Sequence, residues 1–355
     1  MMLPEKPRLL LIGNFLSASL RSRTVSEDLA VRLAANGWDV QTTSTRRARL
    51  PRLVDFLATA WRRRNSYDVA IVDVYSGAAF IWAEAVCTVL RVAGKSFVLA
   101  LHGGNLPEFA RSRANRVARL LRSAAAVVAP SRFLLEQLRP LRADIQLIPN
   151  ALELERYAFR ERSVAAPRIV WLRSFHAIYN PTLAPRALAL IAATHPEARL
   201  LMIGTDTGDG SFQATRAAAE SLGVADRVEF PGGIPKTEVP TRLQEGDVLI
   251  NTTNIDNTPV SVLEAMACGL CVVSTSVGGI PYLLADGVDA LLVPRDDATA
   301  MASAVSRIVH EPALARSLSR SGRAKVESFD WGPVLESWER ILTSAAPRTL
   351  RTANR

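Results

Sequence analysis

The chain has 355 residues, of which 48% are hydrophobic and 22% are charged, and this composition excludes an intrinsically disordered protein. The net charge is +9, and the three cysteines are too few for a secreted scaffold built on disulfides. No apolar run reaches the roughly 18 residues of a membrane span, and Leu9 to Ile12 is too short for a signal peptide. We expect a cytoplasmic protein, soluble or peripheral at the inner face of a membrane, that is long enough for two domains.

Short apolar segments alternate with helical patterns through the first half of the chain. Strands are expected over 8–13, 38–43, 68–74, 96–101, 125–130 and 144–149, with helices near 25–36, 52–64, 78–93 and 132–139. Apolar strands joined by helices predict a parallel sheet with helices on both faces.

The pattern stops at a polar segment and then starts again. Strands of the second half are expected over 168–173, 198–204, 227–232, 247–252, 271–275 and 290–294, followed by helices near 297–310, 313–327 and 331–344. We therefore predict an α/β protein with two doubly wound, Rossmann-like domains whose strand ends face each other across a cleft. The expected boundaries are a first domain at 1–155, a linker at 156–167, a second domain at 168–330, and at 331–355 a helix able to pack back on the first domain, with a basic tail.

The positive charge gathers in two groups of arginines in the first half of the chain. The spacing of the second group places several arginines on one helical face. Two interpretations stay open, a solvated face or a surface for anionic lipid or an anionic acceptor. The basic segments lack interleaved aromatic residues, so nucleic acid is not an expected partner. The two groups are Arg46, Arg47, Arg49, Arg52, Arg62, Arg63 and Arg64, and Arg111, Arg113, Arg116, Arg119 and Arg122.

The segment 256–281 has the strongest chemical pattern. A strand ends in the polar run 251–254, a loop carries Asp256, and Pro259 suits the first turn of a helix. A helix start offers free backbone N–H groups and the positive end of the dipole, and both favour a phosphate. Glu264 lies about one turn further along. Two carboxylates beside an anion site can each bind sugar hydroxyls while the helix start binds phosphates.

This segment resembles the donor site of the retaining glycosyltransferases of family 4, which have the two-domain GT-B fold. The matching features are two acids separated by seven residues, the run 264–269 reading E-A-M-A-C-G, and the pair Gly278-Gly279 after a strand. The resemblance implies that Glu264 binds the nucleotide ribose. Asp256, in place of the usual Glu, is implied to contact the transferred sugar near its reacting carbon. The helix start expected at the diphosphate contains Thr258, Pro259, Val260 and Ser261.

Matches to the same family extend along the chain. Gly13 and Asn14 resemble its glycine loop, where backbone approaches the donor, and His102 before Gly103 resembles a His that contacts donor sugar or acceptor. Arg173 stands where the family places an Arg on the diphosphate. The Lys that usually follows several residues later is missing, because Tyr179 or Asn180 stands there. Gly233 and Ile234 match the place where family members hold the base.

The resemblance implies transfer of a hexosyl unit from a UDP-, GDP- or ADP-sugar to a glycan or lipid-linked acceptor with retention of configuration, as in polysaccharide biosynthesis. The expected catalytic residues are His102, Asp256 and Arg173. No metal or cofactor is expected, because positive groups and helix dipoles can stabilise the leaving diphosphate. Two alternatives stay open, a sugar-nucleotide epimerase or phosphorylase of the same fold and a non-catalytic basic protein that binds membrane or nucleic acid. A nicotinamide dehydrogenase is disfavoured, because no G-x-G-x-x-G pattern follows Gly13.

Overall fold

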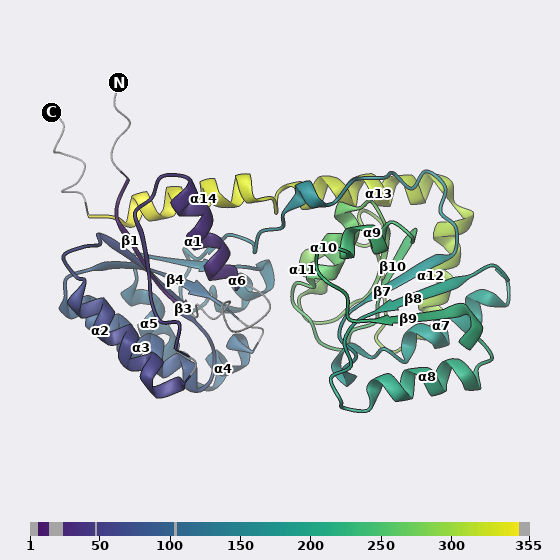
Figure 1. Cartoon of the computed structure of the whole chain (residues 1–355), viewed down its shortest axis with the longest axis horizontal. Helices are drawn as coiled ribbons and strands as arrows, with labels where there is room; N and C mark the ends of the chain where they lie inside the picture. The colour runs from purple at the N-terminus through teal and green to yellow at the C-terminus, as the bar shows by residue number, and fades with distance from the viewer. Residues whose placement is uncertain (1–5, 14–23, 47, 103–104, 348–355) are drawn as a thin grey trace, which may run out of the picture. The chain divides into compact units, whose positions relative to one another are not determined.

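The chain forms two compact units. The computed structural model describes residues 6–13, 24–46, 48–102 and 105–347. Unit 1 contains the described residues up to Ala151 and those from Trp331 onward, and unit 2 runs from Leu152 to Asp330. Each unit is built on a parallel sheet of six described strands with helices on both faces (Figure 1), which confirms the predicted α/β class.

The sheet of unit 1 has the strand order β2-β1-β3-β4-β5-β6. Its strands are β1 (Leu9–Ile12), β2 (Val40–Thr42), β3 (Val69–Val74), β4 (Ser96–Leu101), β5 (Ala126–Ala129) and β6 (Gln146–Leu147). Its helices are α1 (Val25–Ala35), α2 (Arg49–Arg62), α3 (Ala78–Val92), α4 (Leu106–Ser112), α5 (Ala114–Ser123), α6 (Arg132–Leu138) and α14 (Trp331–Ala345).

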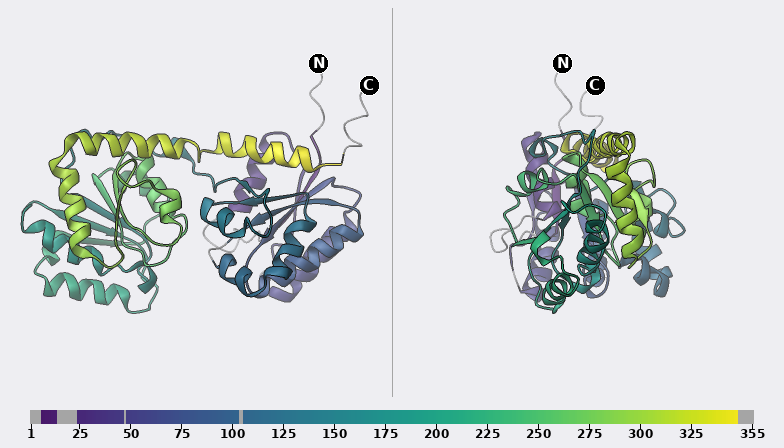
Figure 2. Two further views of the ribbon diagram at one scale, coloured as in Figure 1. Left: turned by 180° about the vertical axis from the view of Figure 1, so that it is seen from behind. Right: turned by 90° about the vertical axis from the view of Figure 1, so that its right-hand side faces the viewer.

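Successive residues of the central strands of unit 1 pack on opposite faces of the sheet. Leu10 and Val72 pack with apolar residues of α2, α3 and α5, whereas Leu9 and Ile71 pack with residues of α1 and α14. Helix α14 lies beside α1 (Figure 1 and Figure 2) and buries Trp338 in the second cluster. In parallel sheets that helices cover on both faces, ligands bind at the carboxyl ends of the strands.

The arginine-rich segment near residue 113 is two helices. The backbone at Arg113, with φ −141° and ψ 40°, ends α4 and precedes α5. Arg111 therefore belongs to α4, whereas Arg116, Arg119 and Arg122 follow one another at three-residue spacing in α5, so that several of the arginines share one face of that helix. Arg116 is also paired, since its guanidinium donates to both carboxylate oxygens of Glu84 at 2.7 and 2.5 Å.

The sheet of unit 2 has the strand order β12-β11-β10-β7-β8-β9. Its strands are β7 (Arg168–Leu172), β8 (Arg199–Ile203), β9 (Val228–Gly232), β10 (Val248–Asn251), β11 (Cys271–Thr275) and β12 (Leu291–Val293). Its α-helices are α7 (Leu183–Ala192), α8 (Ser211–Ser221), α9 (Val239–Leu243), α10 (Val260–Ala267), α11 (Ile280–Leu283), α12 (Ala298–His310) and α13 (Pro312–Glu327). Short 3-10 turns occupy η1 (Leu154–Arg156), η2 (Ala177–Tyr179) and η3 (Ala225–Arg227).

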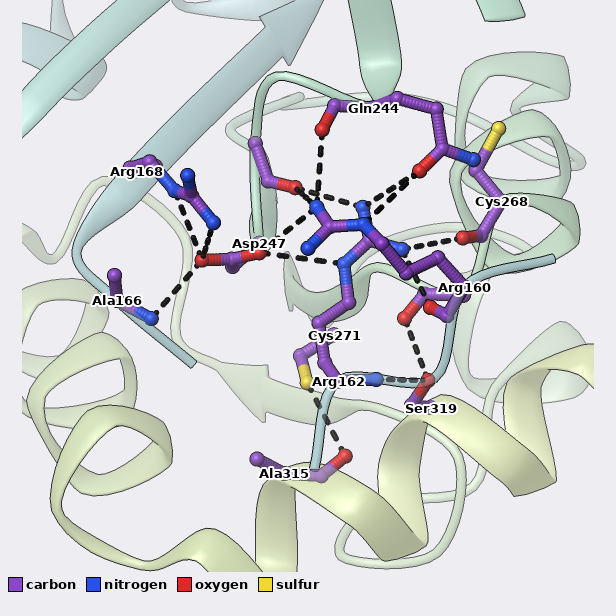
Figure 3. A network of polar contacts seen from close by, with 12 residues as sticks. Arg160, Arg162, Ala166, Arg168, Gln244, Asp247, Cys268, Cys271, Ala315 and Ser319 are labelled. Carbon is purple, nitrogen blue, oxygen red and sulfur yellow. Dashed lines mark hydrogen bonds and ion pairs between the residues drawn. The ribbon is translucent and has the colours of Figure 1, made fainter. Parts of the chain in front are cut away.

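A network of polar contacts holds the segment 156–167, which belongs to unit 2, against the rest of that unit (Figure 3). The Arg162 side chain is fully buried and donates to the carbonyl oxygens of Cys268 and Gly246 at 2.5 and 2.8 Å. The Asp247 carboxylate, also buried, lies 3.3 Å from Arg162 Nε and 2.8 Å from Arg168 Nη2. Burial lowers the pKa of Arg162 to about 10. The segment is therefore anchored by one carboxylate shared among several arginines.

Two cysteines in C-x-x-C spacing lie close to this network. Cys268 and Cys271 are buried free thiols, and Cys271 Sγ donates to the carbonyl oxygen of Ala315 at 3.3 Å (Figure 3). Burial raises the pKa of Cys271 to about 12 and that of Cys268 to about 11, so both thiols stay protonated at neutral pH.

Candidate functional site

In unit 2, an ion pair joins the ends of two neighbouring strands. Arg173 directly follows β7, and Asp256 lies in the loop between β10 and α10; the two strands pair in parallel. The Arg173 guanidinium contacts the Asp256 carboxylate, and the two side chains are 19% and 12% exposed. The same guanidinium lies 4.2 Å from the centre of the Tyr179 ring. Burial lowers the pKa of Arg173. Tyr179, at the place of the missing Lys, therefore contacts the arginine.

Glu264 lies in α10, one turn after the helix start. Its carboxylate accepts a hydrogen bond from the Tyr157 hydroxyl at 2.8 Å. Burial raises the pKa of Glu264, and the Tyr157 hydrogen bond and the charges of Lys236 and Arg173 oppose that rise. The two predicted acids therefore sit in different environments, since Asp256 has a cation in contact and Glu264 has a hydroxyl.

The start of α10 has no side-chain cap. Pro259 occupies the N-cap with an extended backbone and makes no side-chain capping hydrogen bond to the first turn. Val260 is exposed, and Ser261 is buried at the same turn. An uncapped helix start of this kind carries partial positive charge that a phosphate can neutralise.

The pair Gly278-Gly279 packs closely against the backbone of the loop that carries Asp256. A Cβ on Gly278 would lie 2.2 Å from the Asp256 carbonyl oxygen, and one on Gly279 would lie 2.4 Å from that of Asn257. The Gly279 N–H donates to the Asp256 carbonyl at 2.8 Å. Both glycines are thus required by the close approach of two backbone segments, and Gly278 also has φ +54°.

Gly233 and Ile234 follow the edge strand β9, two strands away from β7 in the sheet order. A Cβ on Gly233 would lie 2.3 Å from Thr205 Cγ2, so the chain passes close to the end of β8. Ile234 packs against the apolar cluster that contains residues of α10. His176 caps the turn η2 and lies 3.8 Å from the Asp209 carboxylate. The structure therefore brings Arg173, Asp256 and Glu264 together, and places Gly233 and Ile234 at the far edge of the sheet.

In unit 1, His102 belongs to a polar cluster at the ends of β1, β3 and β4. Its Nε2 lies 2.9 Å from Asp73 Oδ1, and its ring stacks on Tyr75 with centroids 4.9 Å apart. Ser26 Oγ donates to Asp73 Oδ2 at 2.7 Å. Asn14 and Gly103, two further predicted site residues, lie outside the described residues.

A cavity of about 440 Å³ lies beside this cluster. Asp73 and Tyr75 form part of its wall, together with Arg52 of α2. The rest of the lining is mostly apolar and comes from the ends of β1 and β3 and from α2 and α3, with Ile12, Gly13, Phe56, Val72, Ala78, Ala79, Trp82, Ala83 and Val86.

Sequence reasoning missed several members of these clusters. Asp73 lies near the end of the otherwise apolar strand β3, and Tyr75 directly follows that strand. A single acidic residue in an apolar strand was the sequence feature that could have indicated this site. Lys236, whose charge acts on Glu264, follows Gly233 by three positions. Tyr157 carries no local signal, because it meets Glu264 only through the fold. Among the described residues, no group of three or more His, Cys, Asp or Glu side chains has a metal-binding arrangement. None of the described helices is long and apolar enough to cross a membrane.

Two family models match separate parts of the chain. The model described as Glycosyltransferase Family 4 matches residues 26–156, and the model described as Glycosyl transferases group 1 matches residues 166–311. The chain belongs to glycosyltransferase family 4. The resemblance inferred from the motif 256–281 is thereby confirmed.

Curated relatives are about 30% identical to the chain over the aligned segment. The D-inositol 3-phosphate glycosyltransferase of Acidothermus cellulolyticus is 30% identical over 174 residues, which are 47% of this chain and 39% of that protein. The enzyme of the same name from Mycolicibacterium smegmatis is 31% identical over 183 residues, 50% of this chain and 42% of that protein. The matched part thus spans less than half the length of these relatives.

Solved structures of the same fold cover nearly the whole chain. Sucrose-phosphate synthase from Thermosynechococcus elongatus superposes with a TM-score of 0.75 at 19% identity, covering 98% of this chain and 100% of that chain. Anabaena HepE in complex with UDP superposes with a TM-score of 0.74 at 15% identity, covering 95% and 100%. At these identities the likeness concerns the fold, which is GT-B as predicted.

Proposed function

We propose that this family 4 protein transfers a sugar from a nucleoside diphosphate sugar to an acceptor hydroxyl with retention of configuration. The observation that carries the proposal is the cluster of Arg173, Asp256 and Glu264 at one end of the unit 2 sheet, beside the uncapped start of α10. A cation and a helix start suit a diphosphate, and carboxylates suit sugar hydroxyls. We assign donor binding to unit 2 and acceptor binding to unit 1.

The residues divide the work by their chemistry. Arg173 and the N–H groups of 260–261 would neutralise the diphosphate as the bond to the sugar breaks. Glu264 would accept from the ribose hydroxyls, and Asp256 would contact the transferred sugar once the diphosphate competes for Arg173. Thr258 and Pro259 shape the loop before the helix, and Gly233 and Ile234 would contact the base through backbone atoms.

The acceptor is proposed to be a glycan or a lipid-linked glycan, and the cavity of unit 1 favours the lipid-linked class. Among the described residues its lining is largely apolar, and Arg52, Asp73 and Tyr75 contribute the polar side chains. An amphipathic molecule can place an apolar part against Phe56 and Trp82 and a hydroxyl near Asp73.

Helix α2 supports a peripheral location at an anionic membrane surface. Its solvent face carries Leu50, Val54 and Trp61, which are 74%, 63% and 45% exposed. Exposed Arg62 and Arg63 follow at its end. Apolar side chains beside arginines are typical of helices that lie in a lipid interface. Flotation with phosphatidylglycerol vesicles, against phosphatidylcholine vesicles, tests this location.

The function is tested by titrating the protein with UDP, GDP and ADP in a calorimeter and then assaying nucleotide release from the matching sugar donor. UDP is the first choice, because a structural relative, HepE, was solved with UDP-glucose. The anomeric configuration of the product, read by NMR, tests retention. Conversion of the sugar nucleotide without any acceptor would favour an epimerase instead. Absence of binding to all three nucleotides would contradict the proposal.

A further inference from the structure

Asp73 is a buried carboxylate whose described partners are a hydroxyl and an imidazole. Its side chain is 5% exposed, near the carboxyl end of β3. In the part of the chain that the structure describes, no lysine or arginine lies within salt-bridge distance of it. Keeping a carboxylate buried costs free energy unless its oxygens accept hydrogen bonds, so its partners are informative. Those partners are Ser26 Oγ at 2.7 Å and His102 Nε2 at 2.9 Å.

This contact fixes which nitrogen of His102 carries a proton. An ionised carboxylate only accepts, so the nitrogen that faces it donates. Neutral His102 therefore has its proton on Nε2, and its Nδ1 keeps a lone pair. The ring has little freedom to turn, because it stacks on Tyr75 at an interplanar angle of 20° and its backbone N–H donates to the Val74 carbonyl at 2.8 Å.

Gly13 gives the Asp73 carboxylate the space that it occupies. A Cβ on Gly13 would lie 2.2 Å from Asp73 Oδ2 and 3.0 Å from its Cγ. The backbone of Gly13 does not have a positive φ, so another residue could adopt its conformation. The glycine is therefore explained by room for a neighbouring side chain. Residues at the ends of β1, β3 and β4, namely Gly13, Asp73 and His102, thus meet at one place, where they orient the His102 ring.

We propose that Asp73 is a positioning residue, which holds His102 with Nε2 protonated and thereby presents Nδ1 as a hydrogen-bond acceptor for a substrate hydroxyl. Gly13 and Ser26 help to position the Asp73 carboxylate. Gly13 leaves space for it, and Ser26 donates a hydrogen bond to its second oxygen. The identity of the substrate rests on the proposed glycosyl transfer, whereas the orientation of His102 does not. The assignment departs from the expectation that Gly13 serves to let a donor approach the backbone.

The orientation is measured by NMR on the full chain labelled with ¹⁵N at histidine. The chain has four histidines, so the His102 signals are identified by their loss in His102→Gln. Under conditions where the ring is neutral, we expect a protonated Nε2 with a slowly exchanging proton at low field and an unprotonated Nδ1. A His102 ring protonated on Nδ1 in the unaltered protein would overturn the proposal without any variant.

Two variants test the dependence on Asp73. In Asp73→Ala the low-field proton signal should disappear, and in Asp73→Asn it should move upfield, because a neutral amide is a weaker acceptor. In both, kcat should fall on the order of 10²-fold while the Kd for UDP stays unchanged. Asp68→Asn is the matched control, because it removes a carboxylate just before the same strand, where Asp68 pairs with Arg8. The control should leave the His102 signals unaltered.

The outcomes separate this proposal from the proposed function. Loss of the His102 signal together with unchanged kcat in Asp73→Ala would overturn the positioning role, as would a signal that Asp73→Ala does not affect. If the unaltered protein bound no nucleotide, the glycosyl-transfer proposal would fail, and the NMR result would still decide the orientation of His102.

Discussion

The Tyr157 hydroxyl donates a 2.8 Å hydrogen bond to the Glu264 carboxylate, although 107 positions separate the two residues in the sequence. Tyr157 follows the turn η1 at the beginning of unit 2, and Glu264 lies in α10. Burial and the neighbouring carboxylate raise the pKa of the Tyr157 hydroxyl, which therefore stays protonated and keeps donating. The hydrogen bond orients the acid that we assign to the ribose.

Glu264→Gln should stabilise the protein at pH 8 while weakening donor binding. Because burial raises the pKa of Glu264 in the folded state, the ionised carboxylate disfavours folding above that pKa. Glutamine removes this cost and still accepts from Tyr157, so Tm should rise by about 2–4 °C for each kcal/mol recovered. As the pH falls through the folded pKa, Glu264 becomes neutral and the difference in Tm should shrink. Thermal melts of the two proteins at pH 5 and at pH 8 measure the difference in Tm at each pH. A Glu264→Gln protein less stable than the unaltered one at pH 8 would contradict the prediction.

Arg173→Ala should lower kcat on the order of 10²-fold with a smaller effect on donor KM. The guanidinium is the cation in contact with Asp256, and losing it removes charge that we expect to stabilise the departing diphosphate. Arg186→Ala is the control, since it breaks an exposed ion pair with Asp296 in the same unit. Steady-state nucleotide release measures both variants. Equal kcat values for Arg173→Ala and Arg186→Ala would contradict a role for Arg173 in stabilising the diphosphate.

Gly279→Ala should lower kcat without a comparable loss of UDP affinity. Its Cβ would meet the Asn257 carbonyl at 2.4 Å, so the loop that carries Asp256 must shift. Glu264 lies in the neighbouring helix and is not displaced directly. Gly332→Ala is the control, because a Cβ there meets nothing within 4 Å. Calorimetry with UDP beside turnover separates the two effects, and unchanged turnover in Gly279→Ala would show that the loop tolerates the shift.

Asp247→Asn should destabilise unit 2 by about 3–5 kcal/mol, because it leaves the buried Arg162 guanidinium without its charged partner. Asp296→Asn, which breaks an exposed pair with Arg186, should cost only about 0–1 kcal/mol. Urea denaturation followed by tryptophan fluorescence compares the two, since Trp171 is buried in the core of the same unit. Similar losses in both variants would mean that the network in Figure 3 contributes little.

Much of the fold could be predicted because its signals are local. Each apolar run such as 68–74 or 247–252 predicts a strand. Because helical segments connect successive strands, the strands are expected to be parallel. The break at Arg113 could not be predicted, because the arginine spacing is compatible with one continuous helix. The anchoring of the segment 156–167 could not be predicted either. The sequence does not distinguish a buried arginine such as Arg162 from an exposed one, because its partner Asp247 is brought beside it only by the fold.

The sequence by itself determined the family and the motif 256–281, because the spacing of Asp256, Glu264 and the glycines follows from two consecutive strands and the loop and helix between them. It also determined that Arg173 stands at the carboxyl end of a strand, where the structure places it directly after β7. Only the tertiary structure decided which side chains these residues meet: Tyr157 on Glu264, Tyr179 under Arg173, and Asp73 against both His102 and Gly13. Those partners come from distant segments, and their approach depends on strand order and packing, which no local pattern encodes.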